Sequence, residues 1–242
     1  MKTIIKTGIV IATSLLLITH VQAQTKLLPK LKKYSDQLLA DFDKIPAERQ
    51  DKLKEIGDYI LATKAENKPV SLTFICTHNS RRSQMGQAWA KAAASYYGID
   101  NIQTYSGGTS STAFNERSIR ALKKAGFNIT KSGGTTENPN YMLEYEKEST
   151  AILMYSKKYS DKQNPQSEFG AIMVCSEADK SCPMVEGANK RISLPYDDPK
   201  FYDNTPAESA KYDERCKNIA TEMFFVFDYV KKQLILVQEA KK

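Results

Sequence analysis

The stretch Val70-Ser71-Leu72-Thr73-Phe74-Ile75 runs into Cys76-Thr77-His78-Asn79-Ser80-Arg81-Arg82-Ser83 and then into Gln84-Met85-Gly86-Gln87-Ala88-Trp89-Ala90-Lys91-Ala92-Ala93-Ala94. The first segment is apolar and predicts a buried strand, and the third predicts a helix. The eight residues between them therefore form a tight loop that leads from a strand into a helix N-terminus. The backbone N–H groups of such a loop, together with the helix dipole, favour binding of a tetrahedral oxyanion.

The loop opens with a thiol, Cys76, and Arg82 follows six residues later. Positive potential from the helix N-terminus and the guanidinium favours the nucleophilic thiolate. A nucleophile inside an anion cradle predicts covalent chemistry on phosphate-like substrates. Ser83 follows the arginine directly, and Asn79 tolerates a left-handed backbone. The spacing alone is weak evidence, because a cysteine at the end of a buried strand is often only a small apolar residue.

From Val70 onward, segments typical of strands and helices alternate. This order predicts an α/β fold, a doubly wound four-stranded parallel sheet with flanking helices, in which ligands bind at the carboxyl ends of strands such as the one before Cys76. The stretch 151–155 is a candidate further strand, and the polar run 157–166 is expected to be an exposed loop. Strands are predicted at 70–75, 102–105, 171–175 and 191–194, and helices at 81–97, at 115–125 with Gly126 as the end, and at 207–237.

Residues 24–69 predict a helical extension ahead of the main domain, residues 70–242. Leucines recur at near-helical spacing from Leu27 to Leu39, and Pro46 starts a second amphipathic run. We expect these two helices to pack on the main domain or on a partner. Their sequence indicates no chemistry of its own.

Residues 1–23 are typical of a secretory signal peptide. Two lysines precede a short apolar core from Gly8 to Ile18, and the residues up to Ala23 form a cleavage site. We therefore expect an exported, periplasmic protein with no membrane anchor after cleavage. An uncleaved anchor is the alternative, although the apolar core is short for a transmembrane helix.

The whole chain has 242 residues, with 35 Lys and Arg against 28 Asp and Glu and a formal net charge of +7. The two lysines of the signal segment contribute two of these charges. A mild positive balance suits anionic substrates. The lysines are scattered among acidic residues, so no nucleic-acid partner is expected.

Five motifs follow one another across the main domain: Cys76–Ser83, Arg82–Met85, Tyr105–Thr109, Cys175–Pro183 and Asp197-Asp198-Pro199. On these motifs, residues 70–234 resemble the low-molecular-weight protein tyrosine phosphatase family, and more specifically its thioredoxin-coupled arsenate reductase branch. Gln84 in Arg-Ser-Gln-Met is closer to the reductases than to the phosphatases. The two cysteines seven residues apart discriminate best, because a single thiol cannot both supply the two electrons that arsenate needs and be regenerated.

The resemblance implies how an oxyanion would be bound. Cys76 would attack arsenic, Ser83 would hydrogen-bond its thiolate, and Asp198 would protonate the leaving oxygen as a general acid. No metal or cofactor is expected. The expected oxyanion-binding residues are Thr77, His78, Asn79, Ser80, Arg81 and Arg82, with Asn79 also holding the loop backbone.

The resemblance also implies a thiol relay. Cys175 would attack the Cys76 sulfur, releasing arsenite and leaving a Cys76–Cys175 disulfide. Cys182 would then attack Cys175, and a thioredoxin-like electron donor would reduce the final Cys175–Cys182 disulfide. The alternative is a permanent structural disulfide between Cys175 and Cys182, which an exported location allows.

Other candidate residues have simpler readings. Asp197 and Asp198 also fit a plain turn before a proline. Cys216 lies in a helical run and is expected to be a buried core residue. Five aromatic residues are candidates for the pocket wall, with ordinary packing as the default for each: Tyr141, Tyr145, Tyr196, Phe201 and Tyr202.

The chain departs from the resembled family in a few places. His78 stands where the family usually has glycine, so its side chain either adds a donor, narrows the loop or faces outward. Arg81 replaces a second loop cysteine and adds a positive charge. The run 157–166 and the extension 24–69 have no counterpart in short members.

Three functions therefore compete. The first is arsenate reduction through Cys76, Cys175 and Cys182. The second is phosphomonoester hydrolysis, including phosphotyrosine, by Cys76, Arg82 and Asp198. The third is a non-catalytic oxyanion binder or redox sensor, suggested by the residue at position 78. Export is in tension with the reductase, because an exported reductase needs a thioredoxin-like donor outside the reducing cytosol, whereas an exported phosphatase needs only that Cys76 stays reduced.

Overall fold

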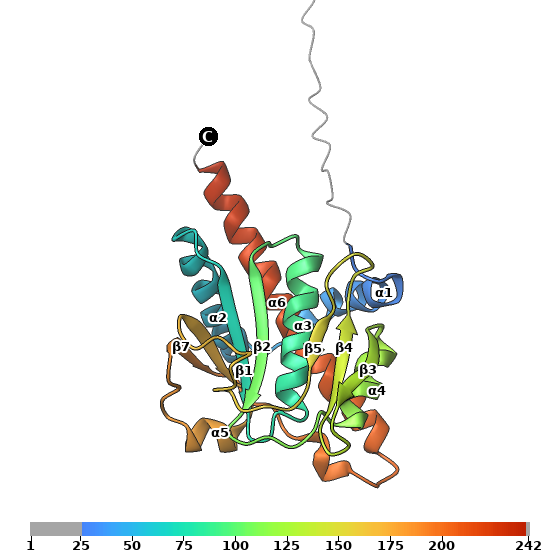
Figure 1. The fold of residues 1–242 in the computed structure, drawn as a ribbon. Coiled ribbons are helices and arrows are strands. Elements are labelled where there is room, and N and C mark those ends of the chain that lie inside the picture. Colours follow the sequence, from blue (N-terminus) through green and yellow to red (C-terminus); the bar gives the residue numbers. More distant parts are fainter. Residues whose placement is uncertain (1–25, 241–242) are drawn as a thin grey trace, which may run out of the picture.

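The protein is described by a computed structural model that covers residues 26–240 (Figure 1). The expected signal segment, residues 1–23, and the expected new N-terminus at Gln24 lie outside the described residues. The central element is a four-stranded sheet with the order β2-β1-β6-β7, in which all neighbouring strands are parallel. Its strands are β1 (Val70–Cys76), β2 (Ile102–Gly108), β6 (Phe169–Met173) and β7 (Ala188–Ser193).

Three helices pack together on one face of this sheet. Gly86 of α3 (Arg82–Tyr96) lets that helix approach the Phe74 ring, and Gly170 of β6 makes room for Tyr59 of α2 (Ala47–Ala65). Register places Gly170 beside Leu72, so Gly170 and Phe74 face the same way. The third helix, α6 (Glu208–Glu239), packs against both α2 and α3.

The predicted fold class is confirmed: a parallel four-stranded α/β sheet is flanked by helices and preceded by N-terminal helices. These N-terminal elements are α1 (Pro29–Leu38), the 3-10 helix η1 (Leu39–Lys44) and α2. Their apolar side chains enter the same core as the sheet, because each helix presents its buried face to α6 or to the sheet. The fully or almost fully buried ones are Leu31, Leu38, Leu53, Ile56 and Ile60.

A second, antiparallel sheet follows α4 (Glu116–Ala125), which ends at Gly126 as predicted. Gly126 has a φ of 119°, a left-handed backbone that favours glycine. The sheet has the order β3-β4-β5, with β3 (Asn128–Gly134), β4 (Pro139–Glu144) and β5 (Ile152–Met154). Only β5 was foreseen from the sequence; β3 and β4 were not.

The run 157–166 is exposed only in part, which corrects the expectation of an exposed loop. Lys157 and Asn164 are buried. The Asn164 amide donates hydrogen bonds to the carbonyl oxygens of Ser106, Lys158 and Tyr159 at 3.1, 3.3 and 3.1 Å. A polar segment is stable in such a place because its polar groups are hydrogen-bonded.

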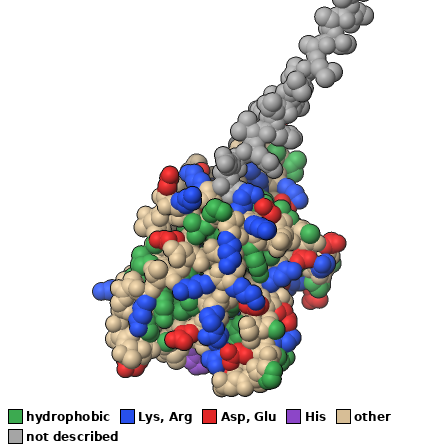
Figure 2. Space-filling model, turned by 90° about the vertical axis from the view of Figure 1, so that its right-hand side faces the viewer, with side chains coloured by type: hydrophobic (Ala, Val, Ile, Leu, Met, Phe, Trp, Pro, Cys, Tyr) green, Lys and Arg blue, Asp and Glu red, His purple; other side chains and the backbone are tan. Residues whose placement is uncertain are grey.

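Charges on the surface are mixed. On the face drawn in Figure 2, Lys and Arg side chains are interleaved with Asp and Glu. Within residues 26–240, no helix is both long and apolar enough to cross a membrane.

Candidate active site

The loop between β1 and α3 is built around Asn79. Its φ is 46°, so it adopts the left-handed backbone that the sequence predicted to be tolerated here. Its side-chain amide donates to Ser83 Oγ at 2.9 Å, and Ser83 Oγ lies 3.0 Å from Cys76 Sγ. Because Asn79 supplies a hydrogen to the Ser83 oxygen, the Ser83 hydroxyl hydrogen is free to point at the sulfur. Ser83 is thus placed to donate to a Cys76 thiolate, as the sequence analysis expected.

Four successive carbonyl groups of the loop are bonded to groups outside the cradle. The Thr77 carbonyl oxygen accepts a hydrogen bond from Ser110 N at 2.8 Å, and the His78 carbonyl oxygen accepts one from Ser156 Oγ at 2.8 Å. The Asn79 carbonyl oxygen accepts from Gln84 Nε2 at 2.9 Å, and the Ser80 carbonyl oxygen accepts from Asn115 N at 3.0 Å. In a planar trans peptide, the N–H of the following residue points opposite to the carbonyl. The loop amides therefore point inward, toward the space above Cys76. Helix α3 also has no side-chain cap, so its first N–H groups are available to an anion.

Arg82 is buried and is held by the segment that precedes η2 (Pro199–Tyr202). Its NH1 donates to the Tyr196 carbonyl at 2.8 Å, and its NH2 pairs with Asp198 Oδ2 at 2.7 Å. Asp198 Oδ1 accepts the Lys200 N–H at 3.1 Å and caps η2. Arg82 Nε is buried and has no hydrogen-bond partner among residues 26–240. Two predicted catalytic residues, 116 positions apart, therefore meet.

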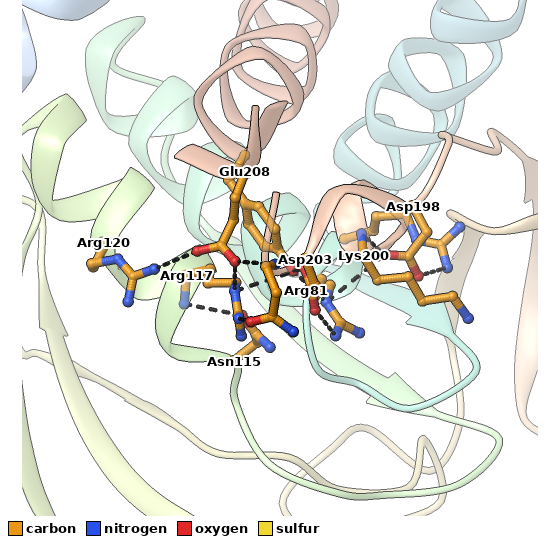
Figure 3. A network of polar contacts seen from close by, with 11 residues as sticks. Arg81, Asn115, Arg117, Arg120, Asp198, Lys200, Asp203 and Glu208 are labelled. Atoms are coloured by element: carbon orange, nitrogen blue, oxygen red, sulfur yellow. Dashed lines mark hydrogen bonds and ion pairs between the residues drawn. The ribbon is translucent and has the colours of Figure 1, made fainter. Parts of the chain in front are cut away.

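Arg81 points into a network of charges instead of into the loop (Figure 3). Its Nε donates to Tyr212 Oη at 2.8 Å and lies 3.8 Å from Asp198 Oδ1, and its NH2 lies 3.5 Å from Asp203 Oδ2. Its guanidinium therefore contacts carboxylates, and its backbone N–H is the part that faces the cradle. The network continues to Arg117, Glu208 and Arg120.

Cys175 lies at the same edge of the sheet as Cys76. The strand pairing between β1 and β6 extends to a bond from Val174 N to Ile75 O at 2.8 Å. Cys175 Sγ is then 3.4 Å from Thr77 Oγ1, and it caps the short helix α5 (Ser176–Ser181). The Cys175 side chain is fully buried.

Cys182 lies at the other end of α5. It is half-buried, and its Sγ donates to the Met184 carbonyl at 3.1 Å. All four cysteines of the chain are free thiols in the structure. A six-residue helix with a rise of about 1.5 Å per residue separates the Cα atoms of Cys175 and Cys182 by roughly 10 Å along its axis.

Comparison with known proteins agrees with this geometry. Residues 71–139 match the family model for low-molecular-weight phosphotyrosine protein phosphatases. The chain is 30% identical over 129 residues to arsenate reductase 2 of Staphylococcus epidermidis, which covers 53% of this chain and 78% of that protein. The chain belongs to the low-molecular-weight protein tyrosine phosphatase superfamily.

Within this superfamily the chain is arsenate reductase-like. An arsenate reductase of Bacillus licheniformis is 26% identical over 148 residues, covering 61% of this chain and 87% of that protein. A low-molecular-weight phosphotyrosine phosphatase structure from Vibrio cholerae O395 superposes with a TM-score of 0.46 at 14% identity, over 68% of this chain and 98% of that one.

His78 is, beside Arg81, one of the two loop residues expected from the sequence to depart from the resembled family. The His78 side chain is exposed and borders a cleft of about 480 Å³ on the outer side of the loop, which Arg81 and Arg117 also line. It faces away from the cradle, so its backbone N–H is what an oxyanion would contact.

Residues far from the loop in sequence also hold the backbone and side chains of the loop in place. Ser156 Oγ donates to the His78 carbonyl, Lys157 N donates to Asn79 Oδ1 at 2.9 Å, and the Tyr155 carbonyl accepts from Gln84 Nε2 at 3.0 Å. These three residues were not anticipated from the sequence. No local pattern marks them, because each bond spans more than 70 positions.

Several candidate residues have ordinary packing roles, which were the default expectation. Cys216 is buried, accepts a hydrogen bond from Trp89 Nε1 at 3.2 Å, and has its pKa raised to about 12 by burial, so it is a core residue as predicted. Tyr145 is in the core, and Tyr141 packs edge-on against Phe114 at 5.8 Å between ring centroids. Phe201 and Tyr202 are exposed in η2, right after Asp198.

Proposed function

We propose that the protein reduces arsenate to arsenite through a relay of Cys76, Cys175 and Cys182. The observation that carries the proposal is the placement of Cys175 beside the oxyanion loop, 3.4 Å from the hydroxyl of Thr77. A phosphatase needs no second thiol there, whereas a reductase does. The likeness to arsenate reductases over most of their length supports the same substrate.

In the first step, Cys76 Sγ attacks arsenic and a bond forms between sulfur and arsenic. The inward loop amides and Arg82 Nε bind the oxyanion, and Asp198 gives its proton to the oxygen that leaves as water. For this to happen, a protonated Asp198 must share or leave its contact with Arg82 NH2. The bound oxyanion then competes with Asp198 for the Arg82 guanidinium.

In the second step, the Cys175 thiolate attacks Cys76 Sγ. The sulfur–arsenic bond breaks and arsenic keeps the electron pair, so arsenic(V) becomes arsenic(III) and two thiols become one disulfide. Cys182 then attacks Cys175, which frees the Cys76 thiolate and forms the Cys175–Cys182 disulfide. A thioredoxin-like dithiol then reduces the Cys175–Cys182 disulfide to two thiols: it gives up two electrons and two protons and becomes a disulfide itself.

The last transfer requires α5 to open. A disulfide needs its two Cα atoms within about 7 Å of each other, and the helix between Cys175 and Cys182 holds them farther apart than that. The opening must break the contacts from β7 that fasten α5: Arg191 NH2 to Asp179 Oδ1 at 2.6 Å and Arg191 Nε to the Cys182 carbonyl at 3.1 Å. The new disulfide then becomes accessible to its reductant through Cys182, which is only half-buried.

A single-turnover assay tests the proposal. Reduced protein, freed of reductant, receives arsenate; arsenite is quantified and disulfides are mapped by mass spectrometry. We expect about one arsenite per chain and a Cys175–Cys182 bridge. Cys182→Ser should still give one arsenite but stop at Cys76–Cys175, while Cys216→Ser serves as the cysteine control. No arsenite, with Cys76 free and reactive, rejects the reductase.

A phosphomonoesterase is the second candidate, because Cys76, Arg82 and Asp198 come together without help from Cys175. Hydrolysis of p-nitrophenyl phosphate that persists in a Cys175→Ser, Cys182→Ser double variant identifies it. Binding of phosphate and arsenate in calorimetry without any product identifies the third candidate, an oxyanion binder or redox sensor.

We also propose that the protein is exported and that residues 1–23 are removed, on the basis of the sequence pattern at that end. The electron donor then has to work in the same compartment. N-terminal sequencing of protein from the periplasm tests this; a chain that still begins at Met1 refutes it.

A further inference from the structure

The N-terminal extension contacts α6 through a shielded ion pair. Arg49 lies in the first turn of α2, and its Nε and NH2 donate to the two carboxylate oxygens of Glu222 on α6 at 2.9 and 2.8 Å. The two side chains are only 21% and 13% exposed. A bidentate pair of this kind fixes geometry as well as charge.

Tyr196 is the third member of this cluster. Its hydroxyl donates to Glu222 Oε2 at 2.6 Å, and the Arg49 guanidinium carbon lies 4.7 Å from its ring centroid. The residue is almost fully buried, and this burial raises its pKa well above 10, so the hydroxyl keeps the proton that it donates. The ring is therefore held by an arginine on its face and by a carboxylate at its tip.

The backbone of the same tyrosine reaches the oxyanion site. Its carbonyl accepts Arg82 NH1 at 2.8 Å, and its N–H donates to Val174 O at 3.2 Å, one residue before Cys175. Asp198, two positions later, pairs with Arg82 NH2. Both hydrogen-bonded contacts of Arg82 thus come from the segment 196–198, and that segment is anchored through the Tyr196 ring.

We infer that Arg49 is a positioning residue, through which the N-terminal extension sets the orientation of the oxyanion-binding Arg82. Removing Arg49 leaves the Glu222 carboxylate half-buried with only the tyrosine hydroxyl as a partner, which is unfavourable. The Tyr196 ring loses the cation on its face, and the carbonyl that holds Arg82 is no longer fixed. This inference rests on the proposed oxyanion site, and it gives the extension a part in that site.

The other ion pairs of the extension provide the contrast. Lys217 of α6 also reaches the extension, pairing with Asp41 at 2.7 Å, but this pair does not contact Tyr196. Lys52 and Glu55 pair within α2 itself at 2.8 Å and are exposed. Lys217→Met therefore removes an extension-to-α6 ion pair without touching the path to Arg82, and it is the matched control.

The experiment compares Arg49→Met, Arg49→Lys, Tyr196→Phe and Lys217→Met in the full mature chain. Inorganic phosphate, which is bound but not reduced, is titrated by calorimetry under reducing conditions well below the unfolding temperature. We expect Arg49→Met to weaken phosphate binding about tenfold, the effect of losing one charged hydrogen bond. Arg49→Lys should lie between, because lysine keeps the charge but not the fork. Lys217→Met should match wild type.

A second readout does not depend on activity. Phenylglyoxal labelling, mapped by mass spectrometry, should modify Arg82 several-fold faster in Arg49→Met than in wild type or Lys217→Met. If Arg49→Met does not fold, Tyr196→Phe, which removes only the hydroxyl, carries the test with the same two readouts.

The outcomes separate the two proposals. Unchanged phosphate affinity and unchanged Arg82 labelling in a variant that is merely less stable overturn the inference, since Arg49 is then only structural. Wild-type protein that binds no phosphate and makes no arsenite refutes the proposed function instead, and the Arg82 labelling still reports whether Arg49 positions that arginine.

Discussion

Asn79 supports the oxyanion loop with its backbone and its side chain together. Its left-handed φ of 46° turns the chain, while its amide group bonds Ser83 and the backbone of Lys157. Sequence reasoning could anticipate the first role, because asparagine is a residue that adopts such a backbone. It could not anticipate the second, because Lys157 is 78 positions away.

Two substitutions separate these roles. Asn79→Gly keeps the backbone freedom and loses only the side-chain bonds. Asn79→Ala loses both, and we expect it to be less stable than Asn79→Gly by about 1 kcal/mol, the cost of a left-handed backbone for a residue with a Cβ. Urea unfolding of the two variants measures the difference; an alanine variant as stable as the glycine variant contradicts it.

Lys157 carries a buried charge next to the loop. Burial lowers its pKa to about 8, and Asp161 opposes this only in part. Between pH 8 and 10.5 the folded protein therefore holds fewer protons than the unfolded chain, so its stability rises with pH in this window.

Replacing this lysine removes that dependence. Lys157→Met keeps the backbone bond to Asn79, and we expect it to be more stable than wild type at pH 7 by up to about 3 kcal/mol. The difference should shrink as the pH approaches 10.5. Unfolding free energies at pH 7 and 10 test this, with the exposed neighbour Lys158→Met as the control; a difference that does not change with pH rejects the assignment.

At the scale of elements, α5 is the part that must move during the proposed relay. Arg191 of β7 holds both Asp179 and the Cys182 carbonyl. We expect Arg191→Met to speed formation of the Cys175–Cys182 disulfide during oxidation by oxidised glutathione, because the helix opens at lower cost. Alkylation quench and mass spectrometry give the rate.

The control for this element is Lys190→Met, on the same strand, whose side chain is exposed. A disulfide that forms equally fast or more slowly in Arg191→Met means that opening of α5 does not limit the exchange.

Helix α3 and strand β1, which flank the loop, pack closely against each other. A Cβ at Gly86 would lie 2.5 Å from the Phe74 ring, so α3 approaches the strand only because this residue has no side chain. We expect Gly86→Ala to destabilise the fold by about 1–3 kcal/mol through overpacking, and Phe74→Leu to restore part of the loss in the double variant. Thermal unfolding of the three variants decides; additive losses contradict a direct clash.

The elements near the loop were predictable because their signals are local. An apolar run, a loop with a cysteine and an alanine-rich segment specify β1, the turn and α3 without reference to the rest of the chain. The strands β3 and β4 contain Gly133, Gly134 and Asn140, and in the described part of the chain they pair with each other and with β5. Their polar, glycine-containing sequences give little strand signal. The segment Tyr155–Lys157 was missed for a related reason, since its contacts are all distant in sequence.

At the scale of the whole molecule, residues 26–69 share one core with the sheet. Helix α2 buries Leu53, Ile56 and Ile60, each contributing about 1.5–3 kcal/mol, against a typical total stability of about 5–15 kcal/mol. We expect the fragment 70–242 to unfold or aggregate. Circular dichroism and size-exclusion chromatography test this, with the full mature chain as reference; a monomeric fragment with the same melting temperature contradicts it.

The ion pair between Arg82 and Asp198 determines how late during synthesis the site can form. These residues are 116 positions apart, so at about 5–20 residues per second a ribosome needs roughly 6–23 seconds to get from one to the other. During that time the nascent chain has Cys76 but neither the carbonyl nor the carboxylate that fixes Arg82. These contacts of Arg82 are therefore acquired late in synthesis, and prematurely terminated chains that lack the last fifth of the protein carry the loop sequence without the groups that hold its arginine.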